Sequence, residues 1–198
     1  SSNETILALG RQAFQIEENA LRSAFDALDD AAFLRAVEVL ASAGRIAASG
    51  CGHTGIACQH FTHLMCCVER PARFLSPSDA THGGSGFLQP GDVLLLASRG
   101  GQTAELLPLL EIARQKSVCV ITVTENVGSA LAKGADIVLA ITVTHETDRF
   151  NSQGTTSFTV LSVLFDALQA ALIERIDFQS EQFRMIHPGG AVGRRLNK

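Results

Sequence analysis

Five short apolar segments, each followed by turn residues, constrain the fold of this chain more than any other feature. They occupy residues 45–49, 73–75, 92–98, 118–124 and 137–143. Most of the stretches between them have the apolar spacing of helices, and strands that alternate with helices form βαβ units with a parallel sheet. We therefore expect an α/β protein in which a five-stranded parallel sheet lies between two helical layers.

The helical patterns also indicate the domain organisation. Apolar positions over residues 4–41 predict two helices separated by a break at Asp29-Asp30. Further helices are predicted at 54–68, 103–115, 127–133 and 156–175. A chain of 198 residues is typically one domain, which we divide into N-terminal helices (1–41) and an α/β core with a C-terminal tail (42–198).

Composition argues against several classes of function. The 16 Lys and Arg residues against 20 Asp and Glu give a net charge of −4, which disfavours a nucleic-acid-binding surface. The five cysteines lack the CxxC spacing of a zinc ribbon. The apolar stretch 158–173 is interrupted by Asp166 and Gln169, as in a buried helix, and no export signal is evident. We expect a cytoplasmic protein with no metal site and neither nucleic acid nor membrane as a partner.

In parallel sheets of this kind, ligands bind beyond the carboxyl ends of the strands. The turn after the third segment, SRGGQT at 98–103, combines two hydroxyls, two glycines and a predicted helix start, which favours phosphate binding. The expected donors are Ser98, Gly101 and Thr103, the last from the first turn of the helix, while Arg99 either adds charge or faces water. The alternative is a tight turn with a threonine cap.

The turn after the first segment, GCGHTG at 50–55, has the G-x-G-x-x-G spacing of a dinucleotide site. Such a site also needs an acidic residue near the end of the second strand, and the first candidate is Asp79. We therefore expect no nicotinamide cofactor. The glycines instead predict close approach of the backbone and of a helix N-terminus to a ligand.

Three histidines, His53, His82 and His187, occur in glycine-rich or turn segments. Loops on a rigid scaffold often carry function, and histidine titrates near neutral pH, so each is a candidate for proton transfer.

Two acidic residues and a run of hydroxyls complete the candidates. Glu146 follows the fifth strand, and Glu105 follows the 98–103 turn. Beside a bound phosphosugar either carboxylate could remove a proton next to a carbonyl. The alternatives are a solvated loop acid for Glu146 and compensation of a helix dipole for Glu105. The hydroxyls of Thr155, Thr156 and Ser157 either cap the last long helix or face the same anion.

Four segments together resemble the sugar isomerase (SIS) domain family, in its arabinose-5-phosphate isomerase-like branch (the KpsF/GutQ type). They are SGCGHTG (49–55), LSPSDATHGGSG (75–86), SRGGQTAEL (98–106) and MIHPGGAVGRRL (185–196). The resemblance covers nearly the whole chain. It implies a flavodoxin-like, doubly wound α/β/α fold and a sugar phosphate as ligand, with no cofactor.

The resemblance also implies a reaction and an assembly. Thr54, Ser98 and Thr103 match phosphate-holding positions, with Arg99, Gly101 and Thr155 beside them. Glu105, Glu146, His82 and His187 match polar residues of the isomerase site, to which we add His53. The expected reaction is aldose–ketose interconversion through an enediol, with Glu146 or His187 moving the proton. Family members are typically tetramers with shared sites, so His82 or His187 would serve a neighbouring subunit.

Departures from the family pattern support an alternative function. The isomerases have Lys where this chain has His53, and a second Ser where it has Gly100. Two further departures leave the identity of the sugar and the length of the protein open: TDRFNSQGTTS after Glu146 replaces an apolar stretch that faces the substrate, and the usual CBS-domain pair does not follow Arg195, in either a naturally short member or a shortened chain. A hydrogen bond to a charged group contributes about 1.5–3 kcal/mol, so the missing serine hydroxyl would weaken phosphate binding unless Arg99 or Thr155 compensates. The alternative is therefore a non-catalytic module that binds or senses a phosphosugar.

Overall fold

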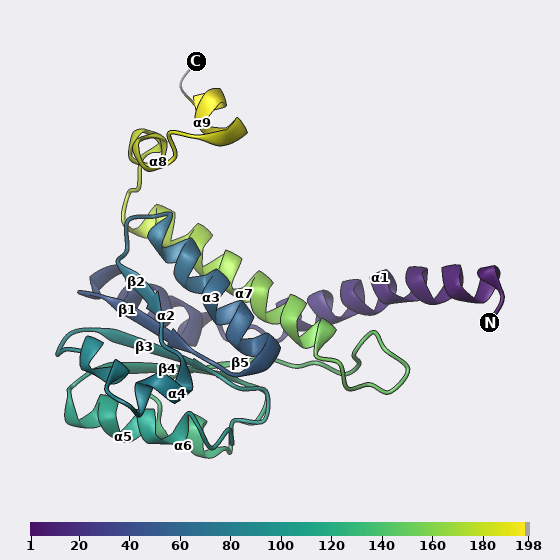
Figure 1. The fold of residues 1–198 in the computed structure, drawn as a ribbon, viewed down its shortest axis with the longest axis horizontal. Helices are drawn as coiled ribbons and strands as arrows, with labels where there is room; N and C mark the ends of the chain where they lie inside the picture. The colour runs from purple at the N-terminus through teal and green to yellow at the C-terminus, as the bar shows by residue number, and fades with distance from the viewer. Residues whose placement is uncertain (197–198) are drawn as a thin grey trace.

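The five apolar segments form one all-parallel sheet in the computed structural model, which describes residues 1–196 (Figure 1). The strands are β1 (Ile46–Ser49), β2 (Ala72–Phe74), β3 (Val93–Ala97), β4 (Cys119–Thr124) and β5 (Ile137–Ala140). Their order in the sheet is β2-β1-β3-β4-β5. The expected doubly wound α/β fold is confirmed, and the order is the flavodoxin-like one.

Helices cover both faces of this sheet. One face carries α2 (Asp30–Ser42), α3 (Gly52–Cys66) and α7 (Thr155–Arg175). The other carries α4 (Pro77–Ala80), the 3-10 turn η1 (Gly84–Phe87), α5 (Leu107–Gln115) and α6 (Ala130–Gly134). Strand β3 is buried throughout because its side chains alternate between the two cores, with Leu95 on the α3 and α7 side and Leu94 on the α5 side.

Helix α7 is long and apolar enough to cross a bilayer, the only such helix in residues 1–196 by that test. In this structure it packs against α1, α2 and α3, and seven of its residues are buried. The rings of Phe61 in α3 and Phe165 in α7 lie 4.8 Å apart between their centroids. This contact holds α3 and α7 side by side, so that their N-terminal ends lie together.

Two element boundaries differ from the sequence prediction. Helix α5 begins at Leu107 rather than at Thr103, and Pro108 occupies its first turn, where a missing N–H removes no helical hydrogen bond. Thr103 therefore precedes the helix, which corrects its predicted place in the first helical turn. Strand β5 ends at Ala140 rather than at Val143, because the Val143 N–H donates to the Glu125 carboxylate (2.6 Å) and not to the sheet.

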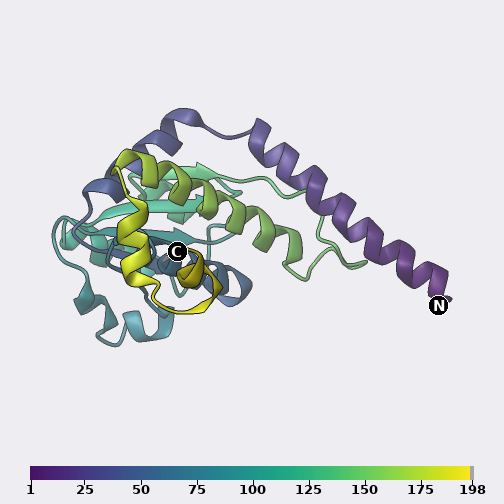
Figure 2. The ribbon, with the colours of Figure 1, turned by 90° about the horizontal axis from the view of Figure 1, so that it is seen from above.

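Helix α1 (Asn3–Asp26) extends away from the sandwich (Figures 1 and 2). Ala20, near its C-terminal end, is buried beside Val143 and Val160. Large apolar side chains on its first four turns are exposed: Ile6, Leu7, Leu9 and Phe14. At the other end of the chain, the tail forms α8 (Ser180–Ile186) and α9 (Gly190–Leu196), two helices that the sequence patterns did not predict.

The strand order positions the candidate site. The chain leaves β1 toward β2 and leaves β3 toward β4, so the two connections diverge from adjacent strands. Ser49, the last residue of β1, pairs with Leu96 of β3. The turns 50–55 and 98–103 therefore begin beside each other, at the topological switch point where doubly wound sheets bind ligands.

Candidate functional site

The first turn leads directly into α3. Gly52 starts the helix with a φ of +57°, and the N-cap residue Cys51 makes no side-chain capping bond among the described residues. Gly55 closes the turn, since a Cβ there would lie 2.6 Å from the Gly50 carbonyl oxygen. The first backbone N–H groups of α3, including that of Thr54, are thus available to an anion.

The second turn is organised by hydroxyls. Ser98 Oγ and Thr103 Oγ1 are 2.8 Å apart, and the N–H of Gly101 donates to Ser98 Oγ at 3.0 Å. The two hydroxyls carry two protons, and their mutual bond uses one, so the other can be donated to a ligand. Gly101 has a φ of +65°, and a Cβ there would lie 2.0 Å from the hydroxyl oxygen of Ser129. The glycine is therefore required by both conformation and space.

A hydrogen bond connects the first turn to the start of α7, and a charge of the second connection acts near it. Burial, and after it the charge of Glu105, raise the pKa of the Cys51 thiol in the first turn. His53 Nδ1 donates to the carbonyl oxygen of Gly154 at 3.3 Å. His53 is in the first turn of α3 and Glu105 is exposed before α5.

Glu146 is buried at the start of α7, with a fully covered side chain. Its Oε2 accepts hydrogen bonds from the N–H groups of Thr156 (2.7 Å) and Ser157 (3.3 Å) and from the hydroxyl of Thr155 (3.3 Å). A carboxylate at a helix N-terminus satisfies free N–H groups and complements the helix dipole. The N-terminus of α7 thus already holds an anion, and Thr155 is engaged with Glu146 and Thr147.

Arg99 links Glu146 to a second carboxylate, that of Glu125. Its Nη1 donates to Glu146 Oε1 at 2.8 Å, its Nη2 donates to the Val143 carbonyl oxygen at 3.1 Å, and its Nε donates to Glu125 Oε2. Glu125 follows β4 directly, so the rule that ligand groups follow strands would have identified it, although we did not select it. A phosphate at the 98–103 turn would compete with two carboxylates for Arg99.

Burial alone would raise the pKa of Glu146. Hydrogen bonds from Ser157 and Thr156, together with the positive charge of Arg99, outweigh burial, and the pKa lies below its ordinary value. Glu146 is therefore ionised at neutral pH but covered by donors, which makes it a weak base in this arrangement.

The other two candidate histidines, His82 and His187, have their described partners outside this network. His82 is exposed between α4 and η1 in the segment after β2, and its N–H donates to the Asp79 carbonyl oxygen at 3.0 Å. His187 stacks on Phe183 of α8, and its Nε2 lies 3.8 Å from Cys67 Sγ. Because α3 rises about 1.5 Å per residue, Cys67 is about 20 Å from the first turn, and the tail lies at the far end of α3 and α7 (Figure 1).

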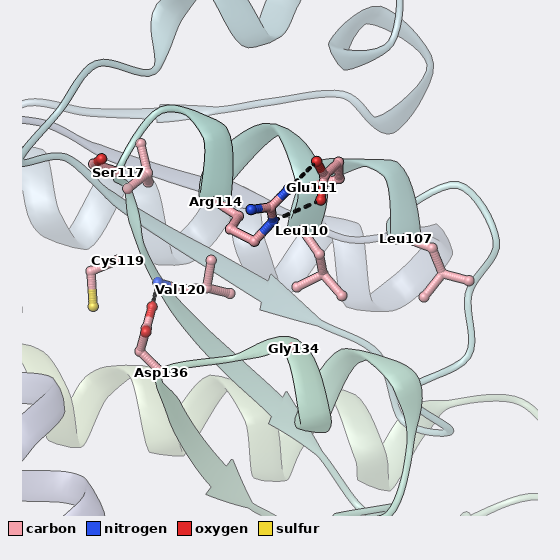
Figure 3. A pocket seen from close by; sticks show the side chains of 10 residues that line it. Leu107, Leu110, Glu111, Arg114, Ser117, Cys119, Val120, Gly134 and Asp136 are labelled. Carbon is pink, nitrogen blue, oxygen red and sulfur yellow. Dashed lines mark hydrogen bonds and ion pairs between the residues drawn. The ribbon is translucent and has the colours of Figure 1, made fainter.

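A cavity of about 680 Å³ lies elsewhere, between α5, α6 and the amino end of β4 (Figure 3). Its walls include Leu110, Ser117 and the ion pair of Arg114 with Glu111, and none of the residues of the two turns. Within residues 1–196, no group of three or more His, Cys, Asp or Glu side chains is arranged to hold a metal ion.

Comparisons with known proteins identify the relatives of this chain. The family model for the SIS domain matches residues 39–171. Arabinose 5-phosphate isomerase KdsD of Pseudomonas aeruginosa is 35% identical over 197 residues, which are 99% of this chain and 60% of that protein. The chain thus spans less than two thirds of that curated relative.

Two solved structures have the same fold. A candidate sugar-phosphate isomerase from Listeria monocytogenes has a TM-score of 0.93 at 40% identity, covering 96% of this chain and 100% of its own. An Escherichia coli protein crystallised in complex with arabinose 5-phosphate has a TM-score of 0.89 at 28% identity, covering 95% of this chain and 100% of its own.

The two adjacent glycines of the second turn provide a matched test of its geometry. A Cβ at Gly101 meets Ser129 in a left-handed backbone conformation, whereas a Cβ at Gly100 meets nothing within 4 Å. We expect Gly101→Ala to lower the free energy of unfolding by about 3 kcal/mol or more. Gly100→Ala should change it by less than about 0.5 kcal/mol. Urea denaturation measures both, and equal stabilities would show that the turn does not depend on Gly101.

Proposed function

This chain belongs to the SIS domain family, and on that basis we propose that it binds a sugar phosphate and isomerises it between aldose and ketose forms. The observation that carries the proposal is the meeting of two donor-bearing turns at the switch point of the sheet, with a carboxylate network beside them. Its relatives include arabinose 5-phosphate isomerases. We propose a pentose 5-phosphate as the substrate.

The phosphate would bind between the two turns. The N–H groups at the start of α3, including that of Thr54, would donate from one side. The Ser98 and Thr103 hydroxyls and the backbone of the 98–103 turn would donate from the other. The N-terminus of α7 already binds the Glu146 carboxylate. We therefore propose that this helix end lies near the carbonyl end of the sugar and not near the phosphate.

The reaction moves one proton between adjacent carbons. A base removes the proton from the carbon next to the carbonyl, an enediol forms, and the proton returns to the former carbonyl carbon, so that atoms and electrons balance. We assign Glu146 as the base, because its carboxylate pairs with Arg99 of the 98–103 turn. Glu105, which follows that turn, and His53, which bonds to Gly154 before α7, are further candidates for proton transfer. His82 and His187 remain candidates for a second subunit's site.

A homo-oligomer would explain two features of the single chain. The first four turns of α1 expose a row of large apolar side chains with Phe14 the most exposed, and such a helix is marginal in water without a partner. His187 lies about 20 Å along α3 from the first turn of its own chain, so it could act only in a neighbour's site. We propose a tetramer with shared sites, in the cytoplasm.

A non-catalytic sugar-phosphate-binding protein is the second candidate. The covering of Glu146 by Arg99 favours it, as do His53 and Gly100 where the isomerases carry Lys and Ser. Such a protein would be stabilised thermally by the ligand without turnover.

Incubation with arabinose 5-phosphate in D₂O distinguishes the two candidates. An isomerase incorporates deuterium at the carbon next to the carbonyl, which NMR detects. Glu146→Gln removes the base, so exchange should fall about 10²-fold or more while phosphate binding is retained. Thermal stabilisation by the ligand with no exchange, across a panel of aldose and ketose phosphates, would favour the binding protein.

The missing hydroxyl at position 100 can be restored. Space around Gly100 is open, so Gly100→Ser should be accommodated and should tighten phosphate binding about tenfold, as one hydrogen bond to a charged group would. Thr103→Val removes a hydroxyl from the same turn and should weaken binding. Calorimetric titration with the sugar phosphate measures the affinity of both variants. Unchanged affinity in both would show that the phosphate does not bind at this turn.

The exposed face of α1 predicts the assembly. Phe14→Glu should shift the light-scattering mass toward the 21.0 kDa of one chain, because it places a charge on the apolar row. Gln12→Glu adds the same charge at an exposed polar position of the same helix and should leave the mass unchanged. A wild-type mass of one chain would contradict the shared-site proposal.

A further inference from the structure

The two oxygens of the Glu146 carboxylate have different partners. Oε2 is held by the N-terminal turn of α7, through the N–H groups of Thr156 and Ser157. Oε1 accepts a hydrogen bond from Arg99 Nη1 at 2.8 Å. If the guanidinium left, Oε1 would gain a free lone pair while Oε2 kept the carboxylate in place. The network thus separates an anchoring oxygen from an oxygen that can react.

Arg99 is placed to make such a movement. Its backbone is fixed, because its carbonyl oxygen accepts from the Glu125 N–H and the Thr124 hydroxyl, both at 3.0 Å. Its side chain is 40% exposed and starts between Ser98 and Gly100, inside the 98–103 turn. A guanidinium binds phosphate oxygens in bidentate fashion, so a dianion at this turn competes directly with the carboxylates.

From this geometry we propose that Arg99 is a positioning residue that covers Oε1 of Glu146 in the unliganded protein, and that a phosphate dianion at the 98–103 turn draws the guanidinium away and exposes that oxygen. This inference rests on the proposed function. It adds a control step, in which the phosphate end of the sugar uncovers the base that acts on the carbonyl end. An unphosphorylated sugar leaves the base covered.

The charged groups around Glu146 allow Arg99 to move from the carboxylates to the phosphate. Arg99 is shared with Glu125, whose other oxygen accepts from the Val143 N–H. From α3, His53 Nδ1 donates to the Gly154 carbonyl oxygen. In the loop of Glu146 itself, His145 is exposed, and the Asp148 carboxylate accepts the backbone N–H groups of Phe150, Ser152 and Gln153. The α7 N-terminus remains to stabilise the carboxylate after Arg99 leaves.

The test compares Arg99→Met with wild type, using deuterium exchange in arabinose 5-phosphate and in arabinose with or without inorganic phosphate. In wild type, inorganic phosphate should speed exchange in arabinose at least tenfold. Arg99→Met should exchange arabinose alone at least tenfold faster than wild type, with less than twofold further gain from phosphate, and should have a raised KM for arabinose 5-phosphate. Removing an arginine with a purely structural role would not accelerate deuterium exchange in either substrate.

Three controls make the result decisive. Arg114→Met removes an exposed arginine paired with Glu111 and should behave as wild type. Arg99→Lys keeps the positive charge, so it shows whether an effect of Arg99→Met comes from the loss of that charge or from a folding defect. ¹³C NMR titration, with the Glu146 signal assigned by Glu146→Gln, measures the pKa of the Glu146 carboxyl. This pKa should be higher in Arg99→Met than in wild type. Inorganic phosphate should raise it more in wild type than in Arg99→Met.

The outcomes separate this inference from the proposed reaction. Exchange in arabinose 5-phosphate by wild type, with no gain in arabinose for Arg99→Met and no phosphate effect on Glu146, would overturn the uncovering step alone. Absence of exchange in every variant, with the phosphate effect on the Glu146 pKa present, would overturn the reaction and leave the movement of Arg99 supported.

Discussion

The N-terminus of α7 binds the carboxylate of Glu146, and the polar edge of the sheet is organised around this contact. The carboxylate satisfies the Thr156 and Ser157 N–H groups and pairs with Arg99. Through Arg99 and Glu125, the segments that follow β3, β4 and β5 are held together. The contact also bears on the proposed ligand site: because the N-terminus of α7 is occupied, we propose the phosphate at the start of α3 and at the 98–103 turn.

The sequence was sufficient for the fold because the fold depends on regular patterns. Each strand appears within a few residues of its predicted place, since runs such as 92–98 are apolar enough to be buried on both faces. Boundaries failed where one side chain decides them: Pro108 delays α5, and Glu125 takes the N–H of Val143 from the sheet. Helices α8 and α9 were missed because their residues are mostly exposed and show no apolar stripe.

The candidate site was predictable in position but not in its connections. The rule that ligand groups follow strands located Ser98, Thr103 and Glu146 at one edge. No spacing in the sequence links Arg99 to Glu125 and Glu146, which are 26 and 47 residues away, because such pairs depend on which strands become neighbours. The catalytic assignments of His82 and His187 stay predictions, and His187 in particular lies at the far end of α3 in its own chain.

The fixed carboxylate has a consequence for selectivity. If the phosphate is held at the ends of β1 and β3, and the carbonyl end must reach a group held at the start of α7, then the spacing of the strands sets the distance between the two ends of the bound sugar. Neighbouring strands in a sheet are about 4.8 Å apart and cannot adjust to a longer or shorter ligand. Selection by chain length would then be built into the scaffold itself, and changes in the 147–157 loop would alter which hydroxyl configurations are accepted rather than how many carbons.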